Sequence, residues 1–387
     1  MGDFNFVSLE WLEWIIPTLV AFWVLPAAHR GWLLASVSLL FLYSLSPYSS
    51  GVLVVFSLLC YLTVSREQLS PARSKFAISL ILIVLVGFKL LAIERSADGG
   101  LVGNGVIPLG ISFYSLRCIH LILERSRGNI GVVDARTLVS YLFFLPTIWV
   151  GPINRFDEFG KGHRRHRWDA ELFSRGIERA IYGYVKVVIV CGFFLQSYWP
   201  YWAAENIGAG TQLWQYLELV REGLTLYLLF SGFSDIAIAF SAMLGYRVGE
   251  NFDAPYLAKN ISDFWRKWHI SLTSWSRDYI YKYVMARSRN PSIGVLASLV
   301  TIGMWHEVSL RYLAWAFYHW VGIVIWQYFK RLRIYAPNMY SLMPSWLSYS
   351  LSVTLTLHFV WLGFLLVKQT TFTSMVNVVQ LLFVGGV

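Results

Sequence analysis

Charged side chains are scarce in this sequence of 387 residues. Asp, Glu, Lys and Arg together make up 14% of it, 56% of the residues are hydrophobic, and the mean hydropathy is +0.53. Because soluble domains average about 25% charged residues, this composition disfavours a soluble enzyme, a soluble transport protein and a nucleic-acid-binding domain. The sequence instead predicts an integral membrane protein.

Cysteine and recognisable cofactor motifs are also lacking. Cys60, Cys118 and Cys191 are isolated in apolar segments without CxxC spacing, which predicts buried free thiols rather than a disulfide framework. No glycine-rich phosphate loop of the Walker or Rossmann type is present. The histidines of the HRRH run at residues 163–166 have no acidic or cysteine partner nearby for a metal. We therefore expect no metal and no permanently bound cofactor.

Long uncharged stretches, by contrast, are abundant. A transmembrane helix needs about 20 mostly apolar residues, and the two longest stretches can each hold a helical hairpin. We therefore predict an all-α integral membrane protein with about ten or eleven transmembrane helices. The stretches are Gly31–Ser65, Thr137–Asn154, Val187–Ala204, Asn290–His306, Tyr312–Phe329 and Ile334–Val367.

The distribution of charge predicts how these helices are oriented. Residues 1–14 contain acidic residues but no Lys or Arg, whereas the basic clusters at 66–75 and 125–136 fall on the inner side if the spans alternate strictly. Since cytoplasmic loops are enriched in Lys and Arg, we predict a multi-pass protein of the inner-membrane type with basic cytoplasmic loops and its N-terminus outside. Residues 94–105 then form an external loop, and Arg155–Arg179 form a cytoplasmic loop with a short helix. This bias also explains the net charge of +10, so no nucleic-acid partner is expected.

The segment DFWRKWHISLTSWSRDYIY, residues 263–281, has the pattern of an amphipathic helix. At about 100° per residue, its tryptophans share one face with His269, and charged residues lie on the opposite face. Anchoring at the membrane interface, with His269 as an incidental polar tip, is one interpretation. A functional imidazole among the tryptophans is the other. The turn-rich connector Gly245–Pro255 precedes this helix.

His306 ends one of the uncharged stretches and is predicted to lie within the apolar part of the chain. An ionisable group in hydrocarbon is energetically costly, so it is a functional candidate by default. A neutral imidazole can take a proton from a hydroxyl while that oxygen attacks a carbonyl. The alternative is a core histidine hydrogen-bonded between helices. His319 lies on nearly the opposite helical face from His306 and is interpreted as structural. Asp235, in the GFSDI segment that lacks a nucleophile turn, is interpreted as a helix-end or packing residue.

Four separated segments form a pattern in one order along the chain. They read IPLGISFYSLRCI (107–119), YLFFLPTIWVGPINRFDEF (141–159), NFDAPYLAKNISDFWRKWHISLTSWSRDYIY (251–281) and GMWHEVSLRYLAWAFYHW (303–320). This pattern resembles the bacterial branch of the membrane-bound O-acyltransferase family, which includes proteins of alginate O-acetylation and of D-alanyl transfer to teichoic acid. The resemblance implies a ring of spanning helices around a central tunnel, with amphipathic cytoplasmic helices. It also implies one integral acyltransferase domain, 1–387, with its motif-bearing core at about 105–330.

The resemblance also implies roles for individual residues. In that family a tunnel lets a cytosolic thioester donor meet an acceptor hydroxyl that arrives from the other side of the membrane. His306 occupies the position of the catalytic histidine, and His269 that of a second histidine lining the tunnel. The residues that would contact substrate or line the tunnel with them are Trp265, Trp268, Trp305, Asn251, Arg277 and Asp278.

The implied function is a membrane O-acyltransferase that moves a D-alanyl or acetyl group from a phosphopantetheine or coenzyme A thioester to a hydroxyl group. The implied partners are an acyl carrier protein or acyl-CoA, an exported helper protein or envelope polymer as acceptor, and membrane lipids. The basic segment Lys161–Arg167 can dock an acidic carrier, although positive-inside bias explains it equally well. The alternative is a non-catalytic membrane scaffold or an envelope polymer or lipid transporter. Glu307, Ala316 and Trp320 replace glycines that the family usually has.

Overall fold

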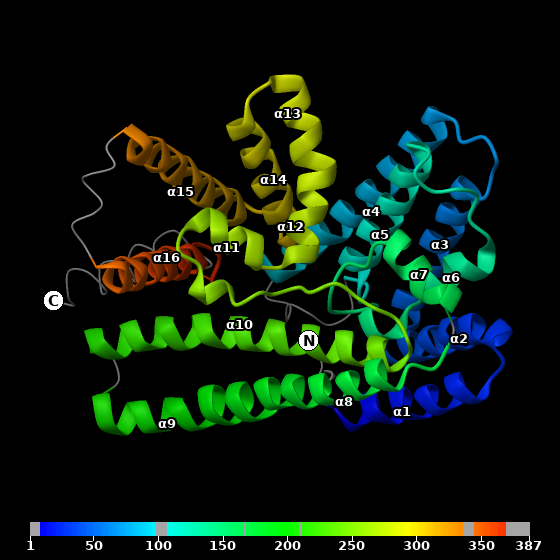
Figure 1. Cartoon of the computed structure of the whole chain (residues 1–387), viewed down its shortest axis with the longest axis horizontal. Coiled ribbons are helices and arrows are strands. Elements are labelled where there is room, and N and C mark those ends of the chain that lie inside the picture. The colour runs from blue at the N-terminus through cyan, green and yellow to red at the C-terminus, as the bar shows by residue number, and fades with distance from the viewer. Residues whose placement is uncertain (1–7, 98–106, 166, 209–210, 336–343, 369–387) are drawn as a thin grey trace. The chain divides into compact units, whose positions relative to one another are not determined.

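The computed structural model of the chain describes residues 8–97, 107–165, 167–208, 211–335 and 344–368. These residues form helices joined by turns and loops and contain no strand, which confirms the predicted all-α class (Figure 1). The chain divides into two compact units. Unit 1 comprises Met1–Val188 and Phe230–Gly249, and unit 2 comprises Ile189–Leu229 and Glu250–Val387. The prediction of a single integral domain stays a prediction.

Unit 1 begins with helices joined by very short turns. Its helices are α1 (Leu9–Val24), α2 (Ala27–Leu45), α3 (Pro47–Val64), α4 (Pro71–Ala97), α5 (Ile111–Ser126), α6 (Ala135–Leu142), η1 (Leu145–Thr147), α7 (Phe156–Arg165) and α8 (Ala170–Tyr184). Ser46 alone separates α2 from α3, and its hydroxyl accepts a hydrogen bond from the Ser49 N–H at 3.2 Å. Pro47 then fills the first helical position, where its missing N–H is harmless. The hairpin predicted for Gly31–Ser65 is therefore confirmed.

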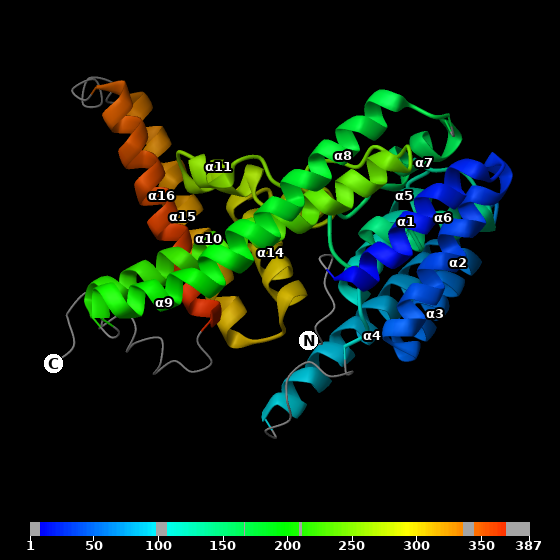
Figure 2. The same ribbon diagram turned by 90° about the horizontal axis from the view of Figure 1, so that it is seen from below.

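Unit 2 contains the C-terminal helices. The chain first passes into unit 2 within η2, returns to unit 1 within α10, and enters unit 2 again at Glu250. Its helices, with those two, are η2 (Val185–Tyr198), α9 (Trp199–Ala203), η3 (Ala204–Gly208), α10 (Gln212–Met243), η4 (Pro255–Leu257), α11 (Ile261–Lys267), α12 (Ile270–Ser276), η5 (Arg277–Tyr281), α13 (Lys282–Ser288), α14 (Pro291–His306), α15 (Leu310–Tyr335) and α16 (Ser345–Lys368). Helix α15 packs against both α14 and α16, and its pairing with α16 is visible in Figure 2. The turn-rich connector that was predicted before α11 is confirmed, since residues 246–254 are not helical.

Five helices in the described part of the chain are long and apolar enough to cross a membrane. They are Pro47–Val64, Pro71–Ile93, Ala170–Gly208, Gln212–Met243 and Ser345–Lys368, with Pro291–His306 as a shorter apolar helix. Large hydrophobic side chains cover their outer surfaces: Ile83 is 68% exposed and Leu355 is 70% exposed. Such surfaces suit contact with lipid rather than water. These features support a multi-pass membrane protein, while the count of ten or eleven spans stays a prediction.

Three predicted segments differ in the structure. Thr137–Asn154 is not a spanning helix, because α6 ends at Leu142 and the next residues form only the short η1 before an irregular segment. Pro146 explains part of this, since proline removes a backbone donor within the run. Ile334–Val367 does not form a hairpin either: its described residues end α15 and build the single helix α16. In Arg155–Arg179 the short helix is present, but residues from Ala170 onward belong to the long helix α8.

Parts of the predicted topology lie outside the described residues. They are residues 1–7 of the acidic N-terminal segment and residues 98–106 of the predicted external loop. The orientation of the chain in the membrane therefore stays a prediction. The three cysteines are buried and free, as predicted.

The first two motifs meet in the core of unit 1. Arg117 on α5 is fully buried, and its guanidinium donates to the Thr147 hydroxyl at 2.6 Å and to the Thr147 carbonyl oxygen. The Thr147 hydroxyl also accepts from the Asn154 amide at 3.0 Å, and the Tyr141 hydroxyl donates to the Asn154 carbonyl oxygen at 2.7 Å. A buried polar group needs such partners. This network holds the irregular segment after α6 against α5.

Asp235 forms an ion-pair cluster elsewhere in unit 1. It lies on α10, and its two carboxylate oxygens accept from Arg179 of α8 at 2.9 Å and from Lys186 of η2 at 2.6 Å. The Asp235 side chain is 12% exposed, compared with 28% for Arg179 and 34% for Lys186. Two cations on one carboxylate fix α8 and η2 to α10, which agrees with the interpretation of Asp235 as a packing residue.

Candidate functional site

The third motif does not form the continuous helix that was predicted for residues 263–281. Helix α11 ends at Lys267, Trp268 is extended, His269 has a left-handed backbone with φ of 45°, and α12 starts at Ile270. Most residues that were predicted to share one face, including Trp265, His269, Leu272 and Trp275, are buried. The periodicity thus predicted the shared face but not the break.

The left-handed conformation of His269 is the unusual feature of this segment. A side chain other than glycine, Asn or Asp adopts it rarely, and such a residue costs roughly 1–2 kcal/mol. Two backbone hydrogen bonds to the preceding connector hold the break open. The Ile270 N–H donates to the Asn251 carbonyl oxygen at 2.9 Å, and the Asp253 N–H donates to the Lys267 carbonyl oxygen at 3.0 Å. Strain that is held by surrounding structure is a pointer to function.

The His269 imidazole is buried, with 3% of the residue exposed, and lies against Asn251. Its Nδ1 is 3.1 Å from Asn251 Oδ1, which also accepts from the Ser271 hydroxyl at 2.8 Å and from the Ser271 N–H at 3.3 Å. His269 lies outside the five candidate spans. Burial, followed by the nearby charge of His306, lowers the pKa of His269 to about 3, so its imidazole is neutral at physiological pH.

His306 is joined to His269 through one aromatic ring. It is the last residue of α14, and its imidazole lies 4.8 Å from the Trp305 ring, which in turn lies 6.0 Å from the His269 ring (centroid distances). Tyr312 stacks on the His306 imidazole at 5.7 Å. Unlike His269, His306 is exposed in the structure. Two histidines that are 37 positions apart in the sequence (306 minus 269) therefore both contact the Trp305 ring in unit 2, one buried and one accessible.

Trp265 and Trp268, both predicted to line the tunnel, have partly different aromatic neighbours in unit 2, and the ring of Phe264 contacts both of them. Trp265 packs against Trp315 at 5.6 Å and against His319 at 5.4 Å. His319 is fully buried, and neither of its ring nitrogens has a hydrogen-bond partner among the described residues. The aromatic neighbours of Trp268 are Tyr227, Phe252, Tyr256, Phe264 and Phe364.

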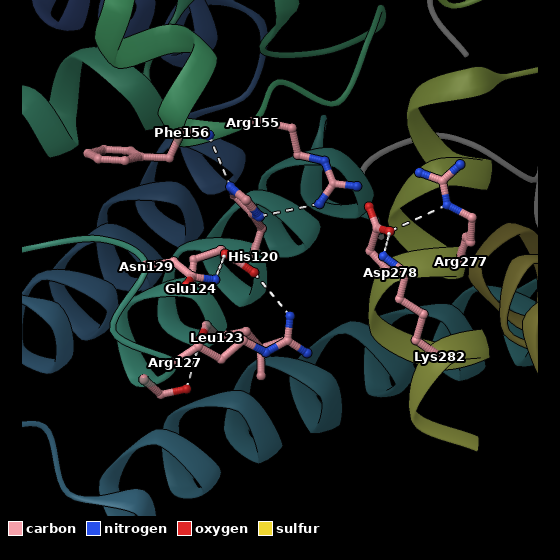
Figure 3. Close-up of polar contacts among 11 residues, drawn as sticks. His120, Leu123, Glu124, Arg127, Asn129, Arg155, Phe156, Arg277, Asp278 and Lys282 are labelled. Carbon is pink, nitrogen blue, oxygen red and sulfur yellow. Dashed lines mark hydrogen bonds and ion pairs between the residues drawn. The ribbon is translucent and has the colours of Figure 1, made fainter. Parts of the chain in front are cut away.

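Arg277 and Asp278 form an ion cluster at the start of η5 (Figure 3). Asp278 Oδ1 accepts from Lys282 Nζ at 2.8 Å and lies 3.4 Å from Arg277 Nε. The Arg277 side chain is 61% exposed. Arg277 therefore lies at the exposed rim of unit 2, and its contact with substrate stays a prediction. Glu307, one of the departures from the family pattern, pairs with Arg311 at 2.8 Å.

The sequence analysis missed a histidine in unit 1. His120 follows directly after the first motif, is 3% exposed, and accepts a hydrogen bond from the Phe156 N–H through Nε2 at 3.0 Å (Figure 3). Arg155 lies 3.5 Å from its Nδ1. Burial, followed by the charge of Arg155, lowers the pKa of His120 to about 4, so it too is neutral. His120 could have been found from the sequence, because it is an ionisable residue among apolar neighbours.

Comparisons with known proteins agree with this arrangement of motifs. The family model described as MBOAT, membrane-bound O-acyltransferase family, matches residues 48–339. The chain is 29% identical over 281 residues to the teichoic acid D-alanyltransferase of Bacillus subtilis (strain 168), which covers 67% of this chain and 68% of that protein. It is 31% identical over 230 residues to the probable alginate O-acetylase AlgI of Pseudomonas fluorescens, which covers 57% of this chain and 45% of that protein. A further teichoic acid D-alanyltransferase, of Lacticaseibacillus rhamnosus, is 26% identical over 308 residues, covering 72% and 74%.

Proposed function

Since the chain belongs to the membrane-bound O-acyltransferase family, we propose that it transfers an acyl group from a cytosolic thioester donor to a hydroxyl of a cell-envelope polymer or of an exported helper protein. The family and the relatives named for D-alanyl and O-acetyl transfer support an acyltransferase that acts on envelope polymers. Teichoic acid and alginate both offer hydroxyl groups, and the acceptor proposed for this chain is likewise a hydroxyl group. The acyl group is D-alanyl or acetyl.

The observation that carries the proposal is the pair of histidines joined by Trp305. His306 is accessible and lies at a helix end, where an acceptor hydroxyl can approach it. His269 is buried among aromatic side chains, an environment that excludes water and so protects a thioester from hydrolysis. The two side chains thus supply an accessible base and a dry binding surface within one unit.

The proposed reaction is direct transfer in one displacement. The His306 imidazole takes the proton of the acceptor hydroxyl while its oxygen attacks the thioester carbonyl. The carbon–oxygen ester bond forms, the carbon–sulfur bond breaks, and the thiolate leaves and takes up a proton. His269 orients or polarises the thioester during this step. No acyl-enzyme intermediate is required.

The donor in this proposal is a phosphopantetheine or coenzyme A thioester, carried by an acyl carrier protein or as free acyl-CoA. Lys161, Arg167 and Arg247 line an open cavity of about 990 Å³ in unit 1, and Glu158 and Asp169 line it too, with Asp169 3.8 Å from Arg247. The three basic residues outnumber the two acidic ones, which supports the docking of an acidic carrier at this surface. The proposal also includes the bacterial inner membrane with the N-terminus outside, and a ring of ten or eleven spans around a tunnel. Trp305, Asn251 and the other predicted tunnel residues would line it.

Substitution of His306 tests the proposal. In membranes carrying the chain, we expect His306→Ala to reduce ester-linked acyl groups on envelope material by at least about 100-fold, because general-base catalysis typically contributes 10²–10⁴-fold. Mass spectrometry of the released acyl groups measures the effect, with protein levels checked by immunoblot. His29→Ala, at an exposed histidine of α2, is the matched control. Near-normal acylation by His306→Ala at equal protein level contradicts the proposed role, and unchanged envelope acylation without the protein favours the scaffold or transporter alternative.

A further inference from the structure

The hydrogen bonds around Asn251 determine which nitrogen of His269 carries the proton. The Ser271 backbone N–H can only donate, and it points at the Asn251 side-chain atom that also meets His269. That atom must therefore be the acceptor Oδ1 rather than the amide nitrogen, which cannot accept. The same oxygen receives the Ser271 hydroxyl at 2.8 Å. Two donors from Ser271 thus fix the orientation of the Asn251 amide.

An oxygen oriented in this way requires a proton on His269 Nδ1. A neutral imidazole has one N–H and one lone pair, and an acceptor 3.1 Å from Nδ1 places the N–H there. The lone pair is then on Nε2. In its neutral state His269 therefore has a hydrogen-bond acceptor at Nε2, and Nε2 cannot donate to the oxygen of a carbonyl group.

We propose that Asn251 is a positioning residue which fixes His269 as a hydrogen-bond acceptor, and that His269 Nε2 holds the thioester donor by an amide N–H of its pantetheine arm. This inference rests on the proposed function, since it takes a pantetheine thioester as the donor. It assigns to His269 the role of orienting the donor and removes the role of polarising the carbonyl. The buried aromatic surroundings of Phe252 and Trp305 suit an uncharged arm of this kind.

The backbone around His269 makes the inference testable by substitution. Ile270 N–H bonds to the backbone oxygen of Asn251, so a new side chain at Asn251 leaves that bond in place. Asn251→Asp keeps an acceptor oxygen for the donors of His269 and Ser271. It also replaces the amide nitrogen with a second oxygen, which adds a negative charge beside the imidazole. Asn251→Ala removes the acceptor. Ser274→Ala, which removes a hydroxyl bonded only locally to the Ser271 carbonyl oxygen on α12, is the control.

The first experiment reads the tautomer directly. In protein labelled with ¹⁵N-histidine and held in lipid nanodiscs, the His269 signals are assigned by their loss in His269→Gln. We expect wild type to show a protonated Nδ1 and an unprotonated Nε2 from pH 8 down to about pH 4, because the pKa of His269 is about 3. In Asn251→Asp the opposite charge stabilises the imidazolium, so the titration midpoint rises by about 1 to 3 pH units. His306 is the titratable group whose charge acts on His269 from α14, and spectra of His306→Gln separate its contribution. A proton on Nε2 in wild type overturns the inference.

The second experiment reads the contact with the donor. S-acetyl-pantetheine and S-D-alanyl-pantetheine are compared with analogues that are N-methylated at the amide nearest the sulfur. We expect N-methylation to raise the KM of the wild type about tenfold, the effect of losing one buried hydrogen bond, with a smaller change in kcat. Asn251→Ala and His269→Ala should lose this discrimination, while Ser274→Ala keeps it.

The two proposals fail in different ways. Equal KM values for the methylated and unmethylated probes in the wild type overturn the inference about Asn251 and His269, while acyl transfer itself stands. If the wild type transfers neither acyl group, or if His306→Ala is fully active, the proposed function fails instead. The ¹⁵N spectra then still decide which nitrogen of His269 is protonated.

Discussion

Asp235 in unit 1 and His269 in unit 2 are both buried polar residues in a chain with few charges, yet their surroundings differ. Asp235 lies in a regular helix and its charge is neutralised by two cations, Arg179 and Lys186. His269 lies at a helix break with a left-handed backbone, and a neutral amide positions its ring. The first arrangement ties helices together, and the second orients one nitrogen.

This contrast shows how a membrane protein uses buried polar groups in two ways. A charge that is matched by opposite charges contributes cohesion, and removing one partner leaves the others unpaired. A neutral imidazole in a strained loop contributes no comparable cohesion, because strain opposes folding. Stability measurements and activity measurements should therefore respond differently in the two places.

The largest expected effect on stability is at Asp235. Asp235→Ala should lower the free energy of unfolding by about 3 kcal/mol, at the lower end for a broken buried pair because the two cations are partly exposed. Denaturant titration in detergent micelles measures it. The control is Glu171→Ala, which breaks the exposed Arg175 pair on α8 and should change stability by less than about 1 kcal/mol. Equal effects of the two substitutions would remove the distinction between the two regions.

A smaller effect is expected from the backbone of His269. Since both substitutions delete the ring, the difference between His269→Gly and His269→Ala isolates the left-handed conformation. We expect the glycine variant to be more stable by about 1 kcal/mol, because glycine adopts positive φ without penalty. At the helical position Ser274 the order should reverse, with alanine favoured by about 0.5–1 kcal/mol. If the alanine variant at position 269 is as stable as the glycine variant, the left-handed backbone at this position carries no strain.

The smallest effect on stability is expected at the exposed ion cluster. Arg277→Gln should change the free energy of unfolding by less than about 1 kcal/mol, because the pair with Asp278 is exposed and Lys282 still neutralises the carboxylate. Lys282→Gln is the control, with a similarly small change expected. A loss well above 1 kcal/mol for Arg277→Gln alone would place Arg277 in the packing of unit 2 rather than at a rim.

Parts of the candidate site were predictable from the sequence and parts were not. Helical periodicity predicted that Trp265 and His269 share one face of the segment, because residues at this spacing point to the same side of a helix. It did not predict the break at His269, since the hydrogen bonds that hold it involve Asn251 and Asp253 of the preceding connector. Thr137–Asn154 shows the same limit: its apolar composition resembled a span, but contacts of Thr147 with Arg117 hold it as an irregular segment.

The sequence by itself determined that this chain is helical, membrane-embedded and a member of an acyltransferase family, because composition and motif order are properties of the linear chain. Only the tertiary structure decided which histidine is buried, which is accessible, and which nitrogen of His269 carries the proton. Those properties depend on hydrogen bonds and ring contacts between residues up to several dozen positions apart. Such contacts exist only once the segments fold together, so no local pattern records them.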